Sequence, residues 1–293
     1  MFDWLKKHFE KENPATTPKT KPVILTIHGY GRRRKHEFDN LALWGKKDGY
    51  DIVQFDMYDL FDEEDHDWMC WVQRAKDQLD QYKKTNRDIY LVGFSMGGVI
   101  ASYLAAMVPV KKLVLLAPAF SYINMDMIIG LPGEGIKEVM ITDAITKSAI
   151  SLWTNDKKEE IQLPRSFYSA FSELIKNLKK YITKVDCPIL FLHGDEDEVI
   201  SIKSSINAYD KVPHERKKLI ILHEGHHRLL MDEKVNWEAY QIMKLFFDDH
   251  LLNEQKIEMA EDIMDKLIEK KHRLDAEKEN LKQVTIHEES VTS

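Results

Sequence analysis

The chain has 293 residues, of which 43% are hydrophobic and 31% charged, with a formal net charge of −7. This length is enough for one large α/β domain or two smaller ones, and an acidic balance argues against nucleic acid as the main partner, since a duplex binder needs a basic face. The only two cysteines, Cys70 and Cys187, exclude a disulfide framework and a four-cysteine zinc site.

The N-terminal segment, residues 1–20, is predicted to hold a short amphipathic helix over residues 2–12, followed by a Pro- and Thr-containing linker. Residues 1–8 lack the apolar region of a secretory signal, and no stretch of the chain approaches about 18 consecutive apolar residues. We therefore expect no membrane span and a cytoplasmic protein.

Short apolar runs alternate with longer helix-like segments over residues 21–252, which we take as one domain. Their apolar residues are consecutive, as in strands buried on both faces, and the intervening segments are long enough for helical crossovers. The pattern predicts an α/β fold with a mostly parallel six-stranded sheet flanked by helices. The predicted strands are Val23–His28, Tyr50–Asp56, Asp88–Gly93, Lys112–Ala117, Pro188–His193 and Lys218–His223.

Two stretches depart from this alternation. Residues 119–165 are too long for one crossover and are predicted to form a helical cap over the carboxyl edge of the sheet. Residues 253–293 are predicted to form a charged helix over 253–286 and a disordered tail. A heptad pattern in this helix weakens after about two repeats, so it either docks on the body of the protein or contributes to a homodimer.

The most specific motif surrounds Ser95, in the sequence Gly93-Phe94-Ser95-Met96-Gly97. A Val- and Leu-rich strand precedes this Gly-x-Ser-x-Gly motif and an Ala-rich helix follows it. In such a turn the serine hydroxyl projects over the sheet edge, and the glycines allow strand and helix to approach. The alternative is that the glycines serve only this close packing.

With this motif the chain resembles the α/β-hydrolase superfamily, particularly its serine carboxylesterases and monoacylglycerol-lipase-like members. The resemblance covers roughly residues 22–250 and implies that Ser95 is the nucleophile. The chain departs from the full eight-strand pattern, because the first two strands of the family are not recognisable. The resemblance implies a sheet in the order 4-3-5-6-7-8, in the strand labels of the family.

An oxyanion hole needs two backbone N–H donors, one of which is expected from Met96, the residue after the nucleophile. The sequence His28-Gly29-Tyr30-Gly31 is similar to the His-Gly-x-Gly element of the family, which implies that the second donor is the amide of Tyr30. His28 is expected to stabilise this loop and to take no part in the chemistry.

The basic run Arg32-Arg33-Arg34-Lys35 follows this loop. It is interpreted as a solvated segment, as a partner of the acidic run Asp62–Asp65, or, through Arg32 or Arg33, as a binding site for an anionic substrate group.

The acid is expected in the loop Gly194-Asp195-Glu196-Asp197-Glu198, after the fifth predicted strand. Asp197 matches the position of the acid in the family, and Asp195 is the rival candidate. A calcium site is not expected, since the loop lacks the ligand spacing and central glycine of an EF-hand.

The base is expected after the last predicted strand, at His226 or His227. The preceding glycine favours His226. The usual distance from strand to histidine in the family, and the spacing to Asp232, favour His227, which we select. A metal site is not expected here, because adjacent side chains seldom face one ion.

The predicted function is hydrolysis of small or medium carboxylic esters through an acyl-enzyme, without a cofactor or metal. Gly29, Phe94, Met125 and Ile128 are candidate substrate contacts. The alternatives are a thioesterase, amidase or peptidase with the same triad, and a non-catalytic binding or scaffold protein that retains the fold.

Overall fold

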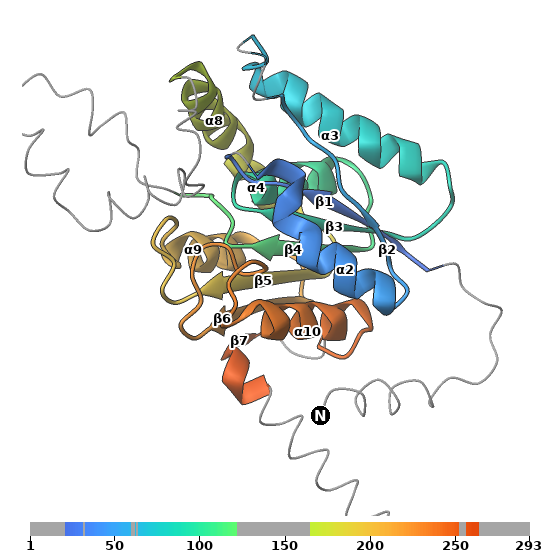
Figure 1. Cartoon of the computed structure of the whole chain (residues 1–293), viewed down its shortest axis with the longest axis vertical. Helices are drawn as coiled ribbons and strands as arrows, with labels where there is room; N and C mark the ends of the chain where they lie inside the picture. Colours follow the sequence, from blue (N-terminus) through green and yellow to red (C-terminus); the bar gives the residue numbers. More distant parts are fainter. Residues whose placement is uncertain are drawn as a thin grey trace, which may run out of the picture.

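A computed structural model describes residues 21–31, 33–59, 62, 64–121, 165–251 and 256–263. In this part of the chain, parallel strands form one seven-stranded sheet in the order β2-β1-β3-β4-β5-β6-β7 (Figure 1). The strands are β1 (Val23–Ile27), β2 (Asp51–Val53), β3 (Ile89–Phe94), β4 (Lys112–Leu116), β5 (Ile189–Gly194), β6 (Lys217–Leu222) and β7 (Lys256–Met259).

The six strands predicted from the sequence correspond to β1–β6, and their order across the sheet matches the order that the family resemblance implies. The prediction of an α/β fold with a mostly parallel sheet is confirmed. The bounds agree to within one residue except at β2, which was predicted over Tyr50–Asp56 and is confined to Asp51–Val53.

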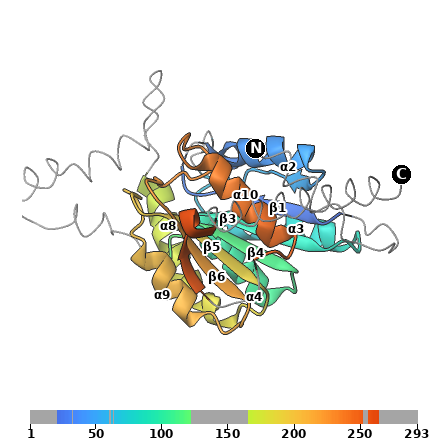
Figure 2. The same cartoon turned by 90° about the horizontal axis from the view of Figure 1, so that it is seen from below.

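Helices cover both faces of the sheet. They are η1 (Arg34–Phe38), α2 (Asp39–Lys47), α3 (Trp68–Lys83), α4 (Met96–Met107), α8 (Arg165–Leu178), η2 (Lys179–Lys184), α9 (Lys203–Lys211) and α10 (Asn236–Phe247). Helices α2 and α10 lie on one side of the sheet, and α4 and α9 lie on the other (Figure 2).

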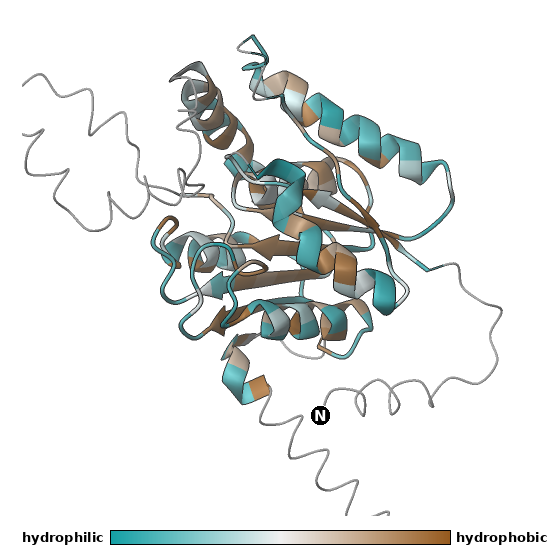
Figure 3. Ribbon diagram, viewed as in Figure 1, coloured by the Kyte–Doolittle hydropathy of each residue, from teal (hydrophilic) through white to brown (hydrophobic). Residues whose placement is uncertain are grey.

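Successive strand residues contribute to two different cores, because side chains alternate between the two faces of a strand. In β1, Leu25 packs with the helices α3, α4 and α8, whereas Ile24 packs with α2 and α10. Both side chains are fully buried. This explains the consecutive apolar residues of the strands, which form the hydrophobic centre of Figure 3.

The prediction of six strands is wrong by one, because β7 extends the sheet beside β6. The predicted helix over 253–286 is therefore wrong at Lys256–Met259, and helix begins only at residue 260. Lys218 Nζ lies 2.7 Å from Glu258 Oε2, which ties the new edge strand to β6. A four-residue strand shows no period of its own, and pairing with β6 is a tertiary effect that local sequence does not reveal.

The predicted cap falls mostly on residues 122–164, and the rest of the C-terminal segment on residues 264–293, both outside the described residues. None of the helices in the described ranges combines the length and the apolar character that crossing a bilayer requires. The site predicted from sequence lies where parallel strands end at their carboxyl edge, which is where open α/β sheets bind ligands.

Candidate active site

Ser95 occupies a sharp turn between β3 and α4. Its backbone has φ 52° and ψ −118°, an unfavourable conformation for a residue with a side chain. A β-carbon at Gly97 would lie 2.0 Å from the carbonyl oxygen of Ile27, and one at Gly93 would lie 2.5 Å from that of Gly97. The two glycines thus permit the contact between strand and helix that forces Ser95 into this turn. Ser95 is 7% exposed.

His227 lies between Ser95 and Asp197. Its Nε2 is 3.2 Å from Ser95 Oγ, and its Nδ1 is 2.8 Å from Asp197 Oδ2. The ring packs against Phe94, with the two centroids 4.9 Å apart. An imidazole with its Nδ1–H directed at a carboxylate presents an unprotonated Nε2 to the serine hydroxyl, which is the arrangement needed to accept a proton.

The rival candidates have other partners. His226 Nδ1 lies 3.0 Å from Asp232 Oδ2, and its side chain is 45% exposed. Asp195 Oδ2 lies 2.8 Å from Nδ1 of His223. The structure therefore brings Ser95 together with His227 and Asp197, and it directs His226 and Asp195 elsewhere.

The Asp197 carboxylate is almost completely buried, with its side chain 1% exposed. Its Oδ1 accepts hydrogen bonds from the backbone N–H groups of Val199, at 2.9 Å, and Ile200, at 2.8 Å. Burial by itself would raise the pKa of Asp197, but His227 and His193 beside it outweigh burial and lower that pKa well below its usual range. Asp197 is thus held as a carboxylate.

The loops that carry Asp197 and His227 touch at two glycines. A β-carbon at Gly194 would lie 1.9 Å from the carbonyl oxygen of Gly225, so neither loop could approach the other if residue 194 had a side chain. The same carbonyl accepts a hydrogen bond of 3.1 Å from the N–H of Glu196. This contact between the ends of β5 and β6 sets the separation of the two loops.

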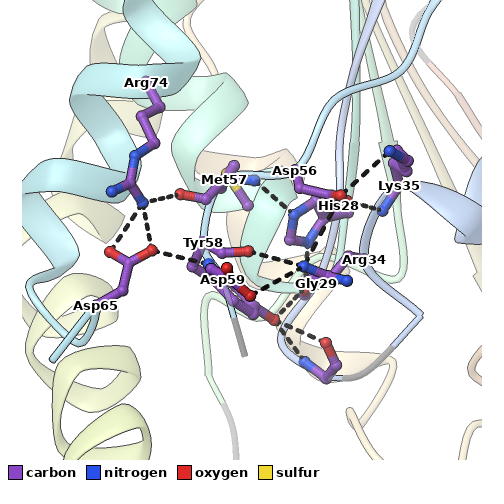
Figure 4. A network of polar contacts seen from close by, with 11 residues as sticks. His28, Gly29, Arg34, Lys35, Asp56, Met57, Tyr58, Asp59, Asp65 and Arg74 are labelled. Atoms are coloured by element: carbon purple, nitrogen blue, oxygen red, sulfur yellow. Dashed lines mark hydrogen bonds and ion pairs between the residues drawn. The ribbon is translucent and has the colours of Figure 1, made fainter. Parts of the chain in front are cut away.

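The loop with Gly29 and Tyr30 is held by two buried side chains (Figure 4). His28 Nδ1 lies 2.8 Å from the carbonyl oxygen of Gly29, and His28 Nε2 accepts a 2.9 Å hydrogen bond from the N–H of Met57. Burial lowers the pKa of His28 from 6.5 to about 4, so this ring is neutral near pH 7. These contacts agree with the loop-stabilising role expected for His28.

Tyr58 is the second of these side chains, and no sequence motif pointed to it. Its hydroxyl accepts a 2.8 Å hydrogen bond from the N–H of Gly31 and lies 2.9 Å from the carbonyl oxygen of the same residue. Tyr58 follows β2, far from Gly31 in sequence, so no local pattern connects the two.

The two N–H groups expected to form the oxyanion hole, those of Tyr30 and Met96, follow the ends of the neighbouring strands β1 and β3. Met96 is the first residue of α4, so its N–H has no carbonyl partner within the helix. Tyr30 follows the end of β1, and its ring packs against Phe171 of α8 with centroids 5.2 Å apart.

Among the candidate substrate contacts, Gly29 lies beside Ser95. A β-carbon at Gly29 would be 3.1 Å from the β-carbon of Ser95. Met125 and Ile128 lie outside the described residues.

The basic run after this loop pairs within the protein. Lys35 Nζ lies 3.2 Å from Asp56, and Arg34 Nη1 lies 3.8 Å from Asp56 and 3.9 Å from Asp59. In the acidic run 62–65, the suggested partner, Asp65 instead forms an ion pair with Arg74 at 2.7 Å. Arg32 lies outside the described residues. Arg34 and Lys35 thus join the loop after β1 to the loop after β2.

Glu37 and Asn40 connect this region to the loop of His227, which sequence reasoning missed. Glu37 Oε1 lies 3.5 Å from Arg228 Nε, and Asn40 Nδ2 donates a 2.8 Å hydrogen bond to the carbonyl oxygen of Leu230. Burial raises the pKa of Glu37, and Arg228 opposes this rise. The partners are almost 200 residues apart in sequence, so only the fold reveals them.

Among the described residues, no cluster of His, Cys, Asp and Glu could hold a metal ion.

The family model described as serine aminopeptidase, S33, matches residues 66–234, which is more than half of the chain. Monoglyceride lipase of Saccharomyces cerevisiae is 24% identical over 284 residues, covering 80% of this chain and 86% of that protein.

Two solved structures share the fold. The crystal structure of a soluble variant of the Saccharomyces cerevisiae monoglyceride lipase, in complex with a substrate analog, has a TM-score of 0.60 at 20% identity and covers 82% of this chain and 90% of that one. The structure of Paleococcus ferrophilus monoacylglycerol lipase has a TM-score of 0.57 at 14% identity, and the match covers 78% of this chain and 96% of that one. The chain is therefore an α/β-hydrolase that belongs to the serine aminopeptidase S33 family.

Proposed function

We propose that the chain is a serine hydrolase that cleaves carboxylic esters of small or medium acyl chains through an acyl-enzyme. The observation that carries this proposal is the continuous contact from Ser95 Oγ to His227 Nε2, at 3.2 Å, and from His227 Nδ1 to Asp197 Oδ2, at 2.8 Å. The relative named monoglyceride lipase supports an ester as substrate.

In the proposed reaction, His227 removes the proton from Ser95 as Oγ attacks the ester carbonyl carbon. The backbone N–H groups of Tyr30 and Met96 stabilise the negative oxygen of the tetrahedral intermediate. His227 then gives its proton to the leaving alcohol as the carbon–oxygen bond breaks. In the second half, His227 takes a proton from a water as the water oxygen attacks the acyl carbon, and it gives this proton to Ser95 Oγ as the bond to that oxygen breaks and the carboxylic acid departs. Asp197 stabilises the imidazolium in both halves.

The test is a panel of p-nitrophenyl esters with graded acyl chains, together with monoacylglycerols, assayed with the wild type and with Ser95→Ala. We expect hydrolysis by the wild type that is strongest for small or medium acyl chains and is abolished in the variant. Activity retained by Ser95→Ala would contradict the mechanism.

Peptide or amide cleavage is the second candidate, because the family model is described as a serine aminopeptidase. Aminoacyl p-nitroanilides and acyl thioesters, assayed beside the oxoesters, show whether the protein cleaves amide, thioester or ester bonds. Cleavage of anilides without any cleavage of oxoesters would replace the ester proposal. Absence of hydrolysis across all substrates, with the fold intact, would favour a binding or scaffold protein.

A cytoplasmic location and a homodimer formed through residues 253–286 remain predictions. Because β7 and residues 260–263 pack on the sheet, the deletion that tests the dimer should begin at residue 264. The prediction requires the mass in solution to fall from that of a dimer to that of a monomer. Fractionation of the cells that express the protein tests the location.

A further inference from the structure

Asp197 contacts two histidines, of which only His227 belongs to the proposed triad. Its Oδ2 lies 2.8 Å from Nδ1 of His227 and 3.2 Å from Nε2 of His193. His193 is in β5, four residues before Asp197, and its side chain is fully buried. One carboxylate oxygen therefore lies within reach of two imidazole rings.

The contacts of His193 determine where its proton lies. Nε2 is 2.8 Å from the carbonyl oxygen of Ile200, which can only accept, so Nε2 carries the hydrogen. Nδ1 is 2.7 Å from Oγ of Ser205, whose hydroxyl can donate to the ring lone pair. Both ring nitrogens therefore have a partner, and the Nε2–H that meets the carbonyl oxygen of Ile200 also lies beside Asp197, with Nε2 3.2 Å from Oδ2.

The result is a nearly symmetric chain of side chains: Ser95, His227, Asp197, His193 and Ser205. Its two ends differ in access. Ser95 is 7% exposed at the sheet edge, whereas Ser205 in α9 is fully buried. The buried half therefore has no route to a substrate, and any influence on the reaction has to pass through Asp197.

We propose that His193 is a positioning residue, whose Nε2–H holds Oδ2 of Asp197 in line with His227; this inference rests on the proposed function. The backbone N–H groups of Val199 and Ile200 already hold Oδ1. Without His193, His227 would be the only side chain among the described residues that donates to Oδ2, and His227 is the group that Asp197 has to orient. A support from a rigid strand keeps Oδ2 in place while His227 gains and loses its proton.

The charge of Asp197 fits this role. A buried carboxylate needs hydrogen-bond donors to remain ionised, and hydrogen bonds to charged groups are the stronger ones. Two ring N–H groups and two backbone N–H groups surround this carboxylate. The direction of the pKa shift of Asp197, downward in spite of burial, agrees with the donation from both rings.

The alternative is that His193 only fills the core between β5 and α9. Two polar substitutions separate the possibilities, because a glutamine amide reaches the position of Nε2 and an asparagine amide reaches only that of Nδ1. His193→Gln therefore retains a donor to Asp197, and His193→Asn retains only the contact with Ser205.

We expect His193→Asn to lower kcat about 10- to 100-fold, as loss of a hydrogen bond to a charged group does, with KM nearly unchanged. His193→Gln should stay within about threefold of the wild-type kcat. The low-field proton NMR resonance of the His227 Nδ1–H, measured without substrate, should move in His193→Asn and stay in His193→Gln. A residue that only fills the core would not produce this difference between the variants.

Ser205→Ala serves as a milder variant if His193→Asn does not fold, since it frees the His193 ring without removing it. It should move the same resonance and lower kcat less than His193→Asn. An unmoved resonance in Ser205→Ala and in every folded His193 variant, or equal losses of kcat in His193→Asn and His193→Gln, would overturn the proposal. Because the resonance needs no substrate, this result is independent of whether the wild type hydrolyses any ester.

Discussion

His226 and His227 are adjacent in sequence, yet their rings contact different carboxylates. His227 meets Asp197 at 2.8 Å inside the protein, whereas His226 meets Asp232 at 3.0 Å near the surface. The side chain of His227 is 8% exposed and that of His226 is 45% exposed. The two residues should therefore differ in their importance for the proposed reaction.

We expect His227→Ala to lower kcat by at least about a thousandfold, because removal of a triad member leaves only binding and the oxyanion hole. His226→Ala should remain within about tenfold of the wild type, since its ring contacts neither Ser95 nor Asp197. The measurement is steady-state kinetics on the best ester of the panel. A larger loss in His226→Ala than in His227→Ala would reverse the assignment of the base.

The choice between these histidines shows what local sequence can and cannot provide. The Gly-x-Ser-x-Gly motif identified Ser95 because its turn is local, made of a strand, a tight connection and a helix. The direction of each histidine depends on how the loop after β6 packs on the end of β5, where Gly225 touches Gly194. That contact joins distant segments, so the sequence favoured His227 without excluding its rival His226.

The same distinction explains the fold. Strands β1 and β3–β6 were predicted because each is an apolar run that is largely buried on both faces, whereas β7 is a short edge strand whose Ile257 is 44% exposed. Tyr58 was missed for a similar reason. Its hydrogen bonds to Gly31 join the segment after β2 to the segment after β1, so they exist only once these strands have paired.

The hydroxyl of Tyr58 holds the loop of Gly29 and Tyr30, because it binds the N–H and the carbonyl oxygen of Gly31. In Tyr58→Phe, the buried N–H of Gly31 loses its acceptor, which costs about 1–3 kcal/mol and releases the loop next to Tyr30. We expect kcat to fall about tenfold, with a smaller change in KM, because the donors act on the transition state.

Tyr103→Phe is the matched control, since Tyr103 lies on α4 and packs on Tyr181 with centroids 4.8 Å apart, away from this loop. It should leave kcat unchanged. Equal rates for Tyr58→Phe and the wild type would show that the hydroxyl has no part in positioning the loop.

Gly97 and Gly45 both lie in helices, but only Gly97 faces backbone at close range. A β-carbon at Gly97 would lie 2.0 Å from the carbonyl oxygen of Ile27, while one at Gly45 would lie 2.9 Å from the terminal Cδ1 of Ile52. We expect Gly97→Ala to destabilise the protein by more than about 3 kcal/mol and abolish hydrolysis, because backbone cannot yield as a side chain can.

Gly45→Ala should change the free energy of unfolding by no more than about 1 kcal/mol, since a rotation of Ile52 relieves the contact and alanine favours the helix. Urea unfolding of both variants provides the measurement. Similar stability for Gly97→Ala and the wild type would contradict the close approach of β1 and α4.

His28 should make the stability of the protein depend on pH. Burial lowers its pKa from 6.5 to about 4 in the folded state. Between these values the unfolded chain binds a proton that the folded protein does not, so the free energy of unfolding decreases as the pH falls. The contribution of His28 is complete above pH 6.5, is lost progressively down to about pH 4, and amounts to about 3 kcal/mol.

Other groups also titrate in this range, so the contribution of His28 is isolated by comparison with His28→Gln, whose amide does not titrate. The free energy of unfolding, measured in urea at steps from pH 4 to pH 7, should fall more steeply with acid in the wild type than in the variant. His28→Gln retains a polar group that can reach the N–H of Met57, so a constant offset between the curves is expected and has no bearing on the slopes. Two parallel curves would mean that His28 is protonated in the folded protein, which is incompatible with its Nε2 accepting the hydrogen bond from Met57.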